Sequence, residues 1–165
     1  MRDTRQYASP LGRILLESDG EALTGLWFAG HKYSGGAPEE SSDATPLPVL
    51  TETARWLDLY FSGRVPGFTP PLAPRGTPFR LAVWKTLLTV PFGETASYAE
   101  IARRIGLPPS AARAVGGAAS HNPIALIIPC HRIIGADGRL TGYAGGLDRK
   151  ARLLEMEKNA CAGVR

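Results

Sequence analysis

The sequence predicts an α+β protein with a small N-terminal part of strands and one helix and a mostly helical C-terminal part. Three observations predict this organisation. Short apolar runs separated by turn residues fill the first thirty positions, apolar residues at helical spacing follow near position 50, and helical patterns dominate after a proline-rich stretch. We expect an N-terminal domain over residues 1–75, with its linker from about residue 63, and a C-terminal domain over residues 76–165.

Antiparallel strands are predicted near the N-terminus. Residues 13–17 and 23–28 are largely apolar runs, and Asp19-Gly20 between them is a hairpin signal. Tyr7 precedes the turn sequence Ser9-Pro10-Leu11-Gly12. These signals indicate a small β unit at the start of the chain.

One helix is predicted in the N-terminal part, at about residues 48–62, where Gly63 ends the pattern. Its apolar and aromatic side chains at helical spacing are Val49, Leu50, Thr53, Trp56, Leu57, Tyr60 and Phe61. Residues 29–48 are rich in Gly, Ser, Pro and Glu and are expected to form a loop. Residues 65–76 hold four prolines and two glycines, which favours a linker between the domains.

The C-terminal part carries signals for a helix-turn-helix unit. Pro78 fits the first turn of a helix that ends near Leu88. Ser97 is predicted to cap the next helix, and a further helix is predicted over residues 110–120 after a short turn. A last helix is expected at about residues 147–158.

The segment 110–120 is unusual for a helix that reads DNA, because Arg113 is its only long polar side chain. Recognition helices in the major groove usually carry several such side chains. Small residues would let this helix approach a narrow minor groove, with Arg113 reaching into the base stack. The same residues fit a helix packed closely against another helix, so the segment alone leaves both interpretations open.

Charge is spread unevenly along the chain. The net charge is +4, yet residues 1–75 hold 7 Lys and Arg against 9 Asp and Glu, whereas residues 76–165 hold 12 against 6. A basic C-terminal half indicates an anionic partner, of which nucleic acid is the usual one. A basic face that is simply solvated is the alternative.

Composition excludes several classes of protein. Hydrophobic residues make up 44% and charged residues 21% of the chain, as is typical of soluble globular proteins. The sequence has no apolar run of the ~20 residues that span a bilayer, and the start MRDTRQYASP lacks the apolar core of a signal peptide, so we expect a cytoplasmic protein. Two cysteines are too few for a disulfide framework, and three histidines are too sparse for a metal site, so no metal is expected.

The segment Ile128-Pro-Cys-His-Arg-Ile-Ile134 contains the candidate nucleophile, Cys130. A thiol reacts as thiolate, and an apolar setting disfavours the thiolate, so reactivity needs a base and hydrogen-bond donors, which His131 and Arg132 would supply. In an extended Pro-Cys-His segment, consecutive side chains point to opposite sides, so we expect a water to bridge His131 and Cys130. A buried inert cysteine is the alternative.

These residues, taken together, resemble the O6-alkylguanine-DNA alkyltransferases, also called methylated-DNA–protein-cysteine methyltransferases. The resemblance is dense over residues 77–158 and rests on the following motifs: Ser97-Tyr98, Ala111-Ala-Arg-Ala-Val-Gly-Gly-Ala118, His121-Asn122-Pro123, Pro129-Cys130-His131-Arg132 and Tyr143-Ala-Gly-Gly146. It implies a ribonuclease H-like α/β domain followed by a winged-helix-like domain. It also implies repair of O6-alkylguanine, and of O4-alkylthymine, in double-stranded DNA. The damaged nucleotide would be flipped out and its alkyl group transferred to Cys130 in a single turnover, without a cofactor.

The resemblance implies a role for each catalytic residue. Cys130 would accept the alkyl group, and His131 would act as base through a water, with Glu157 behind it. Tyr98 would hydrogen-bond guanine N3, which offsets charge on the departing guanine, and Asn122 would be the hinge between the recognition helix and the active-site loop.

The resemblance also implies binding residues. Arg113 would fill the gap left by the flipped base. The other DNA contacts would come from Tyr98, Ala112, Gly116 and Ser120. The base pocket would be lined by Tyr143, Ala144, Ile133 and Gly145. The protein would be a monomer in solution, with cooperativity on DNA left open.

Three rival functions remain at this point. A non-catalytic lesion binder of the same fold would lack the reactive cysteine, yet Cys130 is present. A helix-turn-helix regulator would read the major groove, which the alanine-rich segment 110–120 disfavours. A cysteine hydrolase would need a histidine on a separate element, and His121 is the only other histidine nearby.

Overall fold

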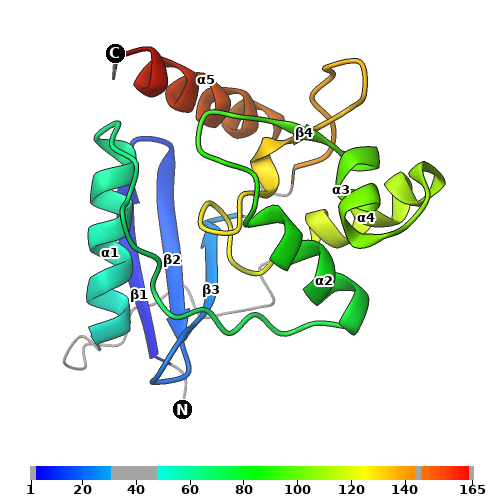
Figure 1. The fold of residues 1–165 in the computed structure, drawn as a ribbon. Coiled ribbons are helices and arrows are strands. Elements are labelled where there is room, and N and C mark those ends of the chain that lie inside the picture. The colour runs from blue at the N-terminus through cyan, green and yellow to red at the C-terminus, as the bar shows by residue number, and fades with distance from the viewer. Residues whose placement is uncertain (1–2, 31–47, 144–145, 164–165) are drawn as a thin grey trace.

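The N-terminal half is built on a three-stranded antiparallel sheet. The computed structural model describes residues 3–30, 48–143 and 146–163, and Figure 1 shows their arrangement. The strands β1 (Asp3–Ser9), β2 (Gly12–Ser18) and β3 (Leu23–Phe28) pair in sequence order. The predicted strands and both turns are therefore confirmed, and Gly12, with φ of 121°, adopts the left-handed backbone that the first turn needs.

Helix α1 (Pro48–Phe61) covers one face of this sheet, as Figure 1 shows. The predicted apolar stripe is buried except for Phe61, which is half-buried, with Leu57 fully enclosed and Tyr60 2% exposed. Gly63, with φ of 83°, follows the end of the helix, as expected. The predicted loop 29–48 falls mainly on residues 31–47, which lie outside the described residues.

The edge strand β3 pairs with two distant segments. The Leu23 N–H donates to the carbonyl of Pro71 in the linker, and Leu23 accepts from Ala73, each at 2.8 Å. Leu26 likewise donates to Pro123 at 2.9 Å and accepts from Ala125 at 2.8 Å. The linker and the loop that precedes Cys130 are therefore both held by the N-terminal sheet, and the sequence did not predict this contact.

Three helices pack together in the C-terminal half: α2 (Pro78–Leu87), α3 (Tyr98–Ile105) and α4 (Ala112–Ser120), with a 3₁₀ turn over Pro109–Ala111. Ser97 caps α3, since its hydroxyl accepts from the Glu100 N–H at 3.1 Å. Gly106, with φ of 89°, closes α3. The predicted helix-turn-helix arrangement of α3 and α4 is confirmed.

Cys130 begins a 3₁₀ turn, Cys130–Arg132, and not the extended segment that we expected. The turn leads into β5 (Ile133–Ile134), which pairs in parallel with β4 (Ala96–Ser97) and so joins the loop to the start of α3. The parallel pair therefore sets Tyr98, the first residue of α3, beside the Cys130 turn.

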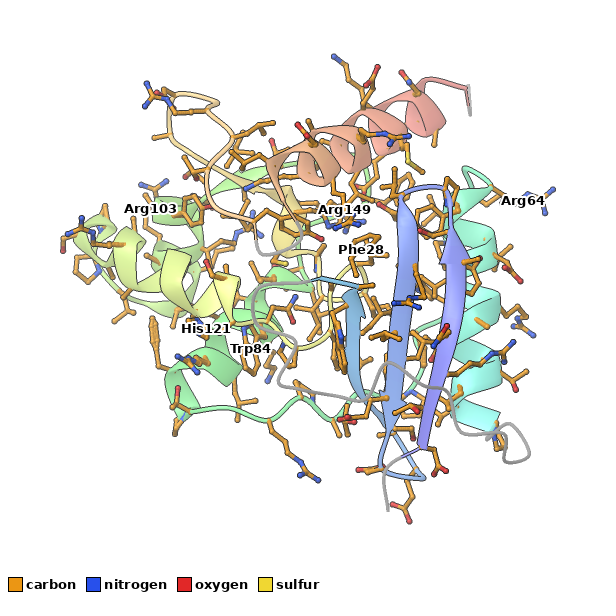
Figure 2. The ribbon with its side chains drawn as sticks, turned by 180° about the vertical axis from the view of Figure 1, so that it is seen from behind. Phe28, Arg64, Trp84, Arg103, His121 and Arg149 are labelled. Atoms are coloured by element: carbon orange, nitrogen blue, oxygen red, sulfur yellow. The ribbon has the colours of Figure 1, made fainter. Side chains whose placement is uncertain are left out.

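The last helix, α5 (Leu147–Gly163), runs five residues beyond the predicted end at 158. Cys161, beyond the predicted end, therefore lies on a helix, where its Sγ contacts the Phe92 carbonyl at 3.8 Å. Arg149 ties α5 to the N-terminal half, because its Nε donates to the Leu11 carbonyl at 3.0 Å and its guanidinium lies 4.6 Å from the Phe28 ring centroid (Figure 2). Within the described ranges, no helix combines the length and the apolar composition that a bilayer span requires.

Candidate active site

Asn122 organises the loop that carries Cys130. Its side-chain oxygen accepts from the Ile124 N–H at 3.0 Å, and its Nδ2 donates to the carbonyls of Ile124 at 3.2 Å and Ile128 at 2.8 Å. The same Nδ2 lies 3.3 Å from Sγ of Cys130. Asn122 is buried directly after α4, so it joins the end of that helix to the thiol.

The Cys130 thiol keeps its proton at neutral pH. Burial raises its pKa, and neither the hydrogen bond from Asn122 nor the charge of Lys150 reverses the shift. Lys150, on α5, is itself fully buried; burial lowers its pKa to about 8, and its Nζ donates to the Thr141 carbonyl at 2.7 Å. Attack by sulfur therefore needs a base.

His131 can provide that base. Its Nε2 lies 2.5 Å from Oε2 of Glu157, and both side chains are buried. An ionised carboxylate only accepts hydrogen bonds, so Nε2 of the neutral ring must be the donor, which leaves the Nδ1 lone pair available. Nδ1 is buried and has no hydrogen-bond partner within the described part of the chain. Burial lowers the pKa of His131 against the opposing influence of Glu157, so the ring is neutral at neutral pH.

Glu157 accepts four hydrogen bonds. Oε2 receives the Tyr60 hydroxyl at 2.6 Å as well as His131, and Oε1 receives Arg132 Nε at 2.8 Å and the Gly93 N–H at 3.1 Å. Burial alone would raise the pKa of Glu157, but hydrogen bonds and charge from His131 and Arg132 outweigh it and lower this pKa to about 2. The carboxylate is therefore ionised wherever His131 is neutral.

The structure departs from the sequence interpretation at Arg132. We expected Arg132 to assist the thiol, but its guanidinium donates to Glu157 and, at 2.8 Å, to the Val90 carbonyl. Sequence reasoning also missed the contacts of Tyr60, Gly93 and Lys150 with this cluster. For Tyr60 the only available signal was a polar hydroxyl within a predicted apolar stripe, and the sequence around Lys150 offered none.

Tyr98 lies at the edge of the cluster. Its hydroxyl donates to the Thr141 carbonyl at 3.3 Å and accepts from the Thr141 hydroxyl at 3.0 Å. Burial raises the pKa of Tyr98, so the hydroxyl remains a donor. Gly116 of α4 faces the ring, since a Cβ built there would lie 3.6 Å from it.

The residues predicted for the base pocket are only partly described. The Tyr143 hydroxyl is buried, and it has no hydrogen-bond partner among the residues described. Burial raises the pKa of Tyr143 well above its ordinary value, so this hydroxyl is also protonated. Ile133 is buried in β5 next to the Cys130 turn. Ala144 and Gly145 lie outside the described residues.

Helix α4 has one buried and one exposed face. The buried face packs against α2 and α3 and contains Val115, Ala118 and Ala119. Trp84 of α2 holds the C-terminal end of α4 in place, because its Nε1 donates to the Ala118 carbonyl at 2.8 Å. The exposed face contains Arg113, Ala114 and Gly117; the other predicted DNA contacts, Ala112, Gly116 and Ser120, are half-buried. The interpretation as a packed helix is therefore confirmed for the buried face, and the interpretation as a minor-groove contact stays a prediction for the exposed face.

Comparisons with known proteins identify the family. Residues 4–74 match the 6-O-methylguanine DNA methyltransferase ribonuclease-like domain, and residues 78–159 match the DNA binding domain of the same family. A methylated-DNA–protein-cysteine methyltransferase of Mycobacterium bovis is 48% identical over 156 residues, which cover 94% of this chain and 92% of the relative.

Solved structures agree with this assignment. The crystal structure of the Mycobacterium tuberculosis O6-methylguanine methyltransferase matches with a TM-score of 0.86 and 46% identity, covering 97% of this chain and 94% of that one. Mycobacterium tuberculosis OGT in complex with DNA matches with a TM-score of 0.83 and 47% identity, covering 95% and 93%. The chain belongs to the 6-O-methylguanine DNA methyltransferase family, the methylated-DNA–protein-cysteine methyltransferases, which repair DNA by alkyl transfer.

Proposed function

We propose that this protein flips O6-alkylguanine, and O4-alkylthymine, out of duplex DNA and transfers the alkyl group irreversibly to Cys130. One observation carries this proposal. His131, which follows Cys130 in the chain, is held by a buried hydrogen bond to Glu157, and this bond leaves the Nδ1 lone pair of His131 available. Nucleophilic catalysis by a protonated thiol requires a base, and the neutral imidazole of the residue that follows Cys130 would serve as one through a water.

The transfer is a substitution at carbon. Through a water, His131 takes the thiol proton, and sulfur forms a bond to the alkyl carbon while the carbon–oxygen bond breaks. Guanine keeps the electron pair of that bond, and the Tyr98 hydroxyl at N3 offsets the resulting charge. Tyr98 must leave Thr141 to do so, because Thr141 holds its hydroxyl in the free protein. Asn122 keeps the sulfur in place at the hinge after α4.

The product is a thioether, which is chemically inert at neutral pH, so each molecule acts once. With excess duplex DNA that contains O6-methylguanine, we expect methyl transfer to stop at one methyl group per protein molecule. Quantifying the methyl transferred from labelled DNA measures this stoichiometry. Transfer that continues beyond one methyl group per molecule would contradict an irreversible acceptor.

The exposed face of α4 is the proposed minor-groove surface. Its small side chains permit close approach to the groove, and Arg113 is long and exposed. Ala112, Gly116 and Ser120 would line the same contact, and the basic C-terminal half would make binding weaken as salt rises. The base pocket would be completed by Tyr143, Ala144, Ile133 and Gly145. Action as a monomer and a cytoplasmic location stay predictions.

The Arg113→Ala variant is expected to transfer methyl from duplex DNA more slowly, by about tenfold to a hundredfold, because the vacancy left by the flipped base costs a few kcal/mol to keep open. Its rate with free O6-benzylguanine should stay unchanged. Single-turnover rates on both substrates measure this. Arg103→Ala removes the same charge from the surface of α3 and is the matched control. Equal losses of rate on both substrates would contradict the proposal that Arg113 fills the gap left by the flipped base.

A further inference from the structure

Tyr60 differs from the other groups around the His131–Glu157 pair, because it comes from the N-terminal half of the chain. It lies near the C-terminal end of α1, the part of that helix nearest to α5 in Figure 1, and it donates to a carboxylate 97 positions later in the chain. We propose that Tyr60 is a positioning residue of the alkyl transfer, which tunes the His131–Glu157 pair by donating its hydroxyl hydrogen bond to Oε2 of Glu157. The inference rests on the proposed function, since it concerns the base that activates Cys130.

The surroundings of Tyr60 fix its hydroxyl. The ring stacks on Trp56 with centroids 5.2 Å apart and meets Phe92 edge-on at 5.8 Å. The side chain is 2% exposed, so water cannot readily replace the contact. Burial and the charge of Glu157 raise the pKa of Tyr60 well above its ordinary value, so the hydroxyl stays protonated and can only donate to the carboxylate. Packing alone would be satisfied by phenylalanine, and the hydroxyl therefore has a separate role.

Tyr60 and His131 share one oxygen atom. Both donate to Oε2 of Glu157, at 2.6 and 2.5 Å, whereas Arg132 and Gly93 occupy Oε1. When His131 takes the thiol proton it becomes a cation, and the negative charge on Oε2 stabilises it. The Tyr60 hydroxyl donates to the same oxygen and so reduces the negative charge that this oxygen offers to His131. It therefore limits how strongly Glu157 stabilises the imidazolium. This keeps the pKa of His131 low, so the ring is neutral and able to accept a proton.

Other ionisable groups also act on this pair. Within the described residues, those that face His131 or Glu157 are Cys130 and Arg132 on the same turn, Lys150 on α5, Tyr60 on α1, and Tyr143 before α5. Lys150 and Arg132 both lower the pKa of His131 by their charge. Tyr60 donates to Glu157 through a neutral hydroxyl, so removing that hydroxyl changes the hydrogen bonding without changing the net charge.

The test is the pH dependence of methyl transfer to Cys130 under single-turnover conditions, with saturating duplex DNA that contains O6-methylguanine. The rate falls on the acid side as His131 becomes protonated. In Tyr60→Phe we expect the midpoint of this acid limb to move to higher pH by about half a unit. The rate on the acid side should therefore be roughly threefold lower than in the wild type. The midpoint of the limb does not depend on the fraction of protein that is folded, so a moderate loss of stability leaves the readout intact.

Two further proteins sharpen the test. Site-specific 3-fluorotyrosine at position 60 keeps the ring and the hydroxyl but donates more strongly, so it should move the acid limb downward. Tyr7→Phe is the matched control, because it removes a tyrosine–carboxylate hydrogen bond of 2.6 Å, to Asp58, in the same half of the protein. Its acid limb should coincide with that of the wild type.

The outcomes separate the two proposals. If the wild type methylates Cys130 and the Tyr60 variants share its acid limb, or shift it in the same direction as each other, the role of Tyr60 is refuted and the proposed function survives. If the wild type transfers no methyl group to Cys130, both proposals are refuted.

Discussion

Replacing Cys130 with alanine is expected to abolish methyl transfer while duplex DNA that contains O6-methylguanine is still bound. The sulfur is the only atom in the proposed mechanism that forms a bond to the alkyl carbon, so no residual slow reaction should remain. Cys130 begins a short turn and is only partly buried, so alanine should fit without a large loss of stability. Transfer of labelled methyl and DNA binding, measured on the same preparation, check both parts of the prediction.

Cys161→Ala is the matched control, because it removes the second thiol of the chain, which lies exposed on α5. It should transfer one methyl group at the wild-type rate. Transfer by Cys130→Ala, or loss of transfer in Cys161→Ala, would place the acceptor elsewhere.

Glu157→Gln is expected to have the largest combined effect on stability and rate. It leaves the Arg132 guanidinium buried without its counter-charge and removes the charge that stabilises protonated His131. Breaking a buried ion pair from one side costs about 3 kcal/mol or more in the free energy of unfolding. Loss of the support for the base should slow methyl transfer by about a hundredfold. Denaturant unfolding and single-turnover rates measure the two effects.

The stability effect should depend on pH in a defined direction. The pKa of Glu157 is about 2 in the folded protein against an ordinary value of 4.5, so its ionised form stabilises the fold fully above pH 4.5. This contribution is lost as pH falls toward 2. The difference in the free energy of unfolding between Glu157→Gln and the wild type should therefore become smaller over that range. Glu155→Gln, an exposed change on the same helix, is the control. A difference that stays constant with pH would contradict an ionised Glu157.

The sequence predicted those parts of the fold that local signals determine. Asp19-Gly20 marked a hairpin, Ser97 a helix cap, and Gly63 a helix end, since each acts within a few residues. The pairing of β3 with Pro71 and Ala125 could not be predicted in the same way. Backbone hydrogen bonds between distant segments depend on the assembled fold and leave no local pattern.

The same distinction holds in the site. Cys130 and His131 are adjacent in sequence, and the family resemblance implied Glu157 as the partner of His131. Tyr60 counted only as one more residue of a helical apolar stripe, because nothing in its own segment indicates the end of α5 as its partner. The actual target of Arg132 was equally hidden, since a turn in place of an extended strand redirected its side chain.

The most direct test of the central claim is to locate the transferred group. After reaction with duplex DNA that contains O6-methylguanine, the intact mass of the protein should rise by one methyl group in place of one hydrogen, and peptide mapping should place that methyl on Cys130. An unchanged mass, or a methyl group found on Cys161 or on any other residue, would contradict the account.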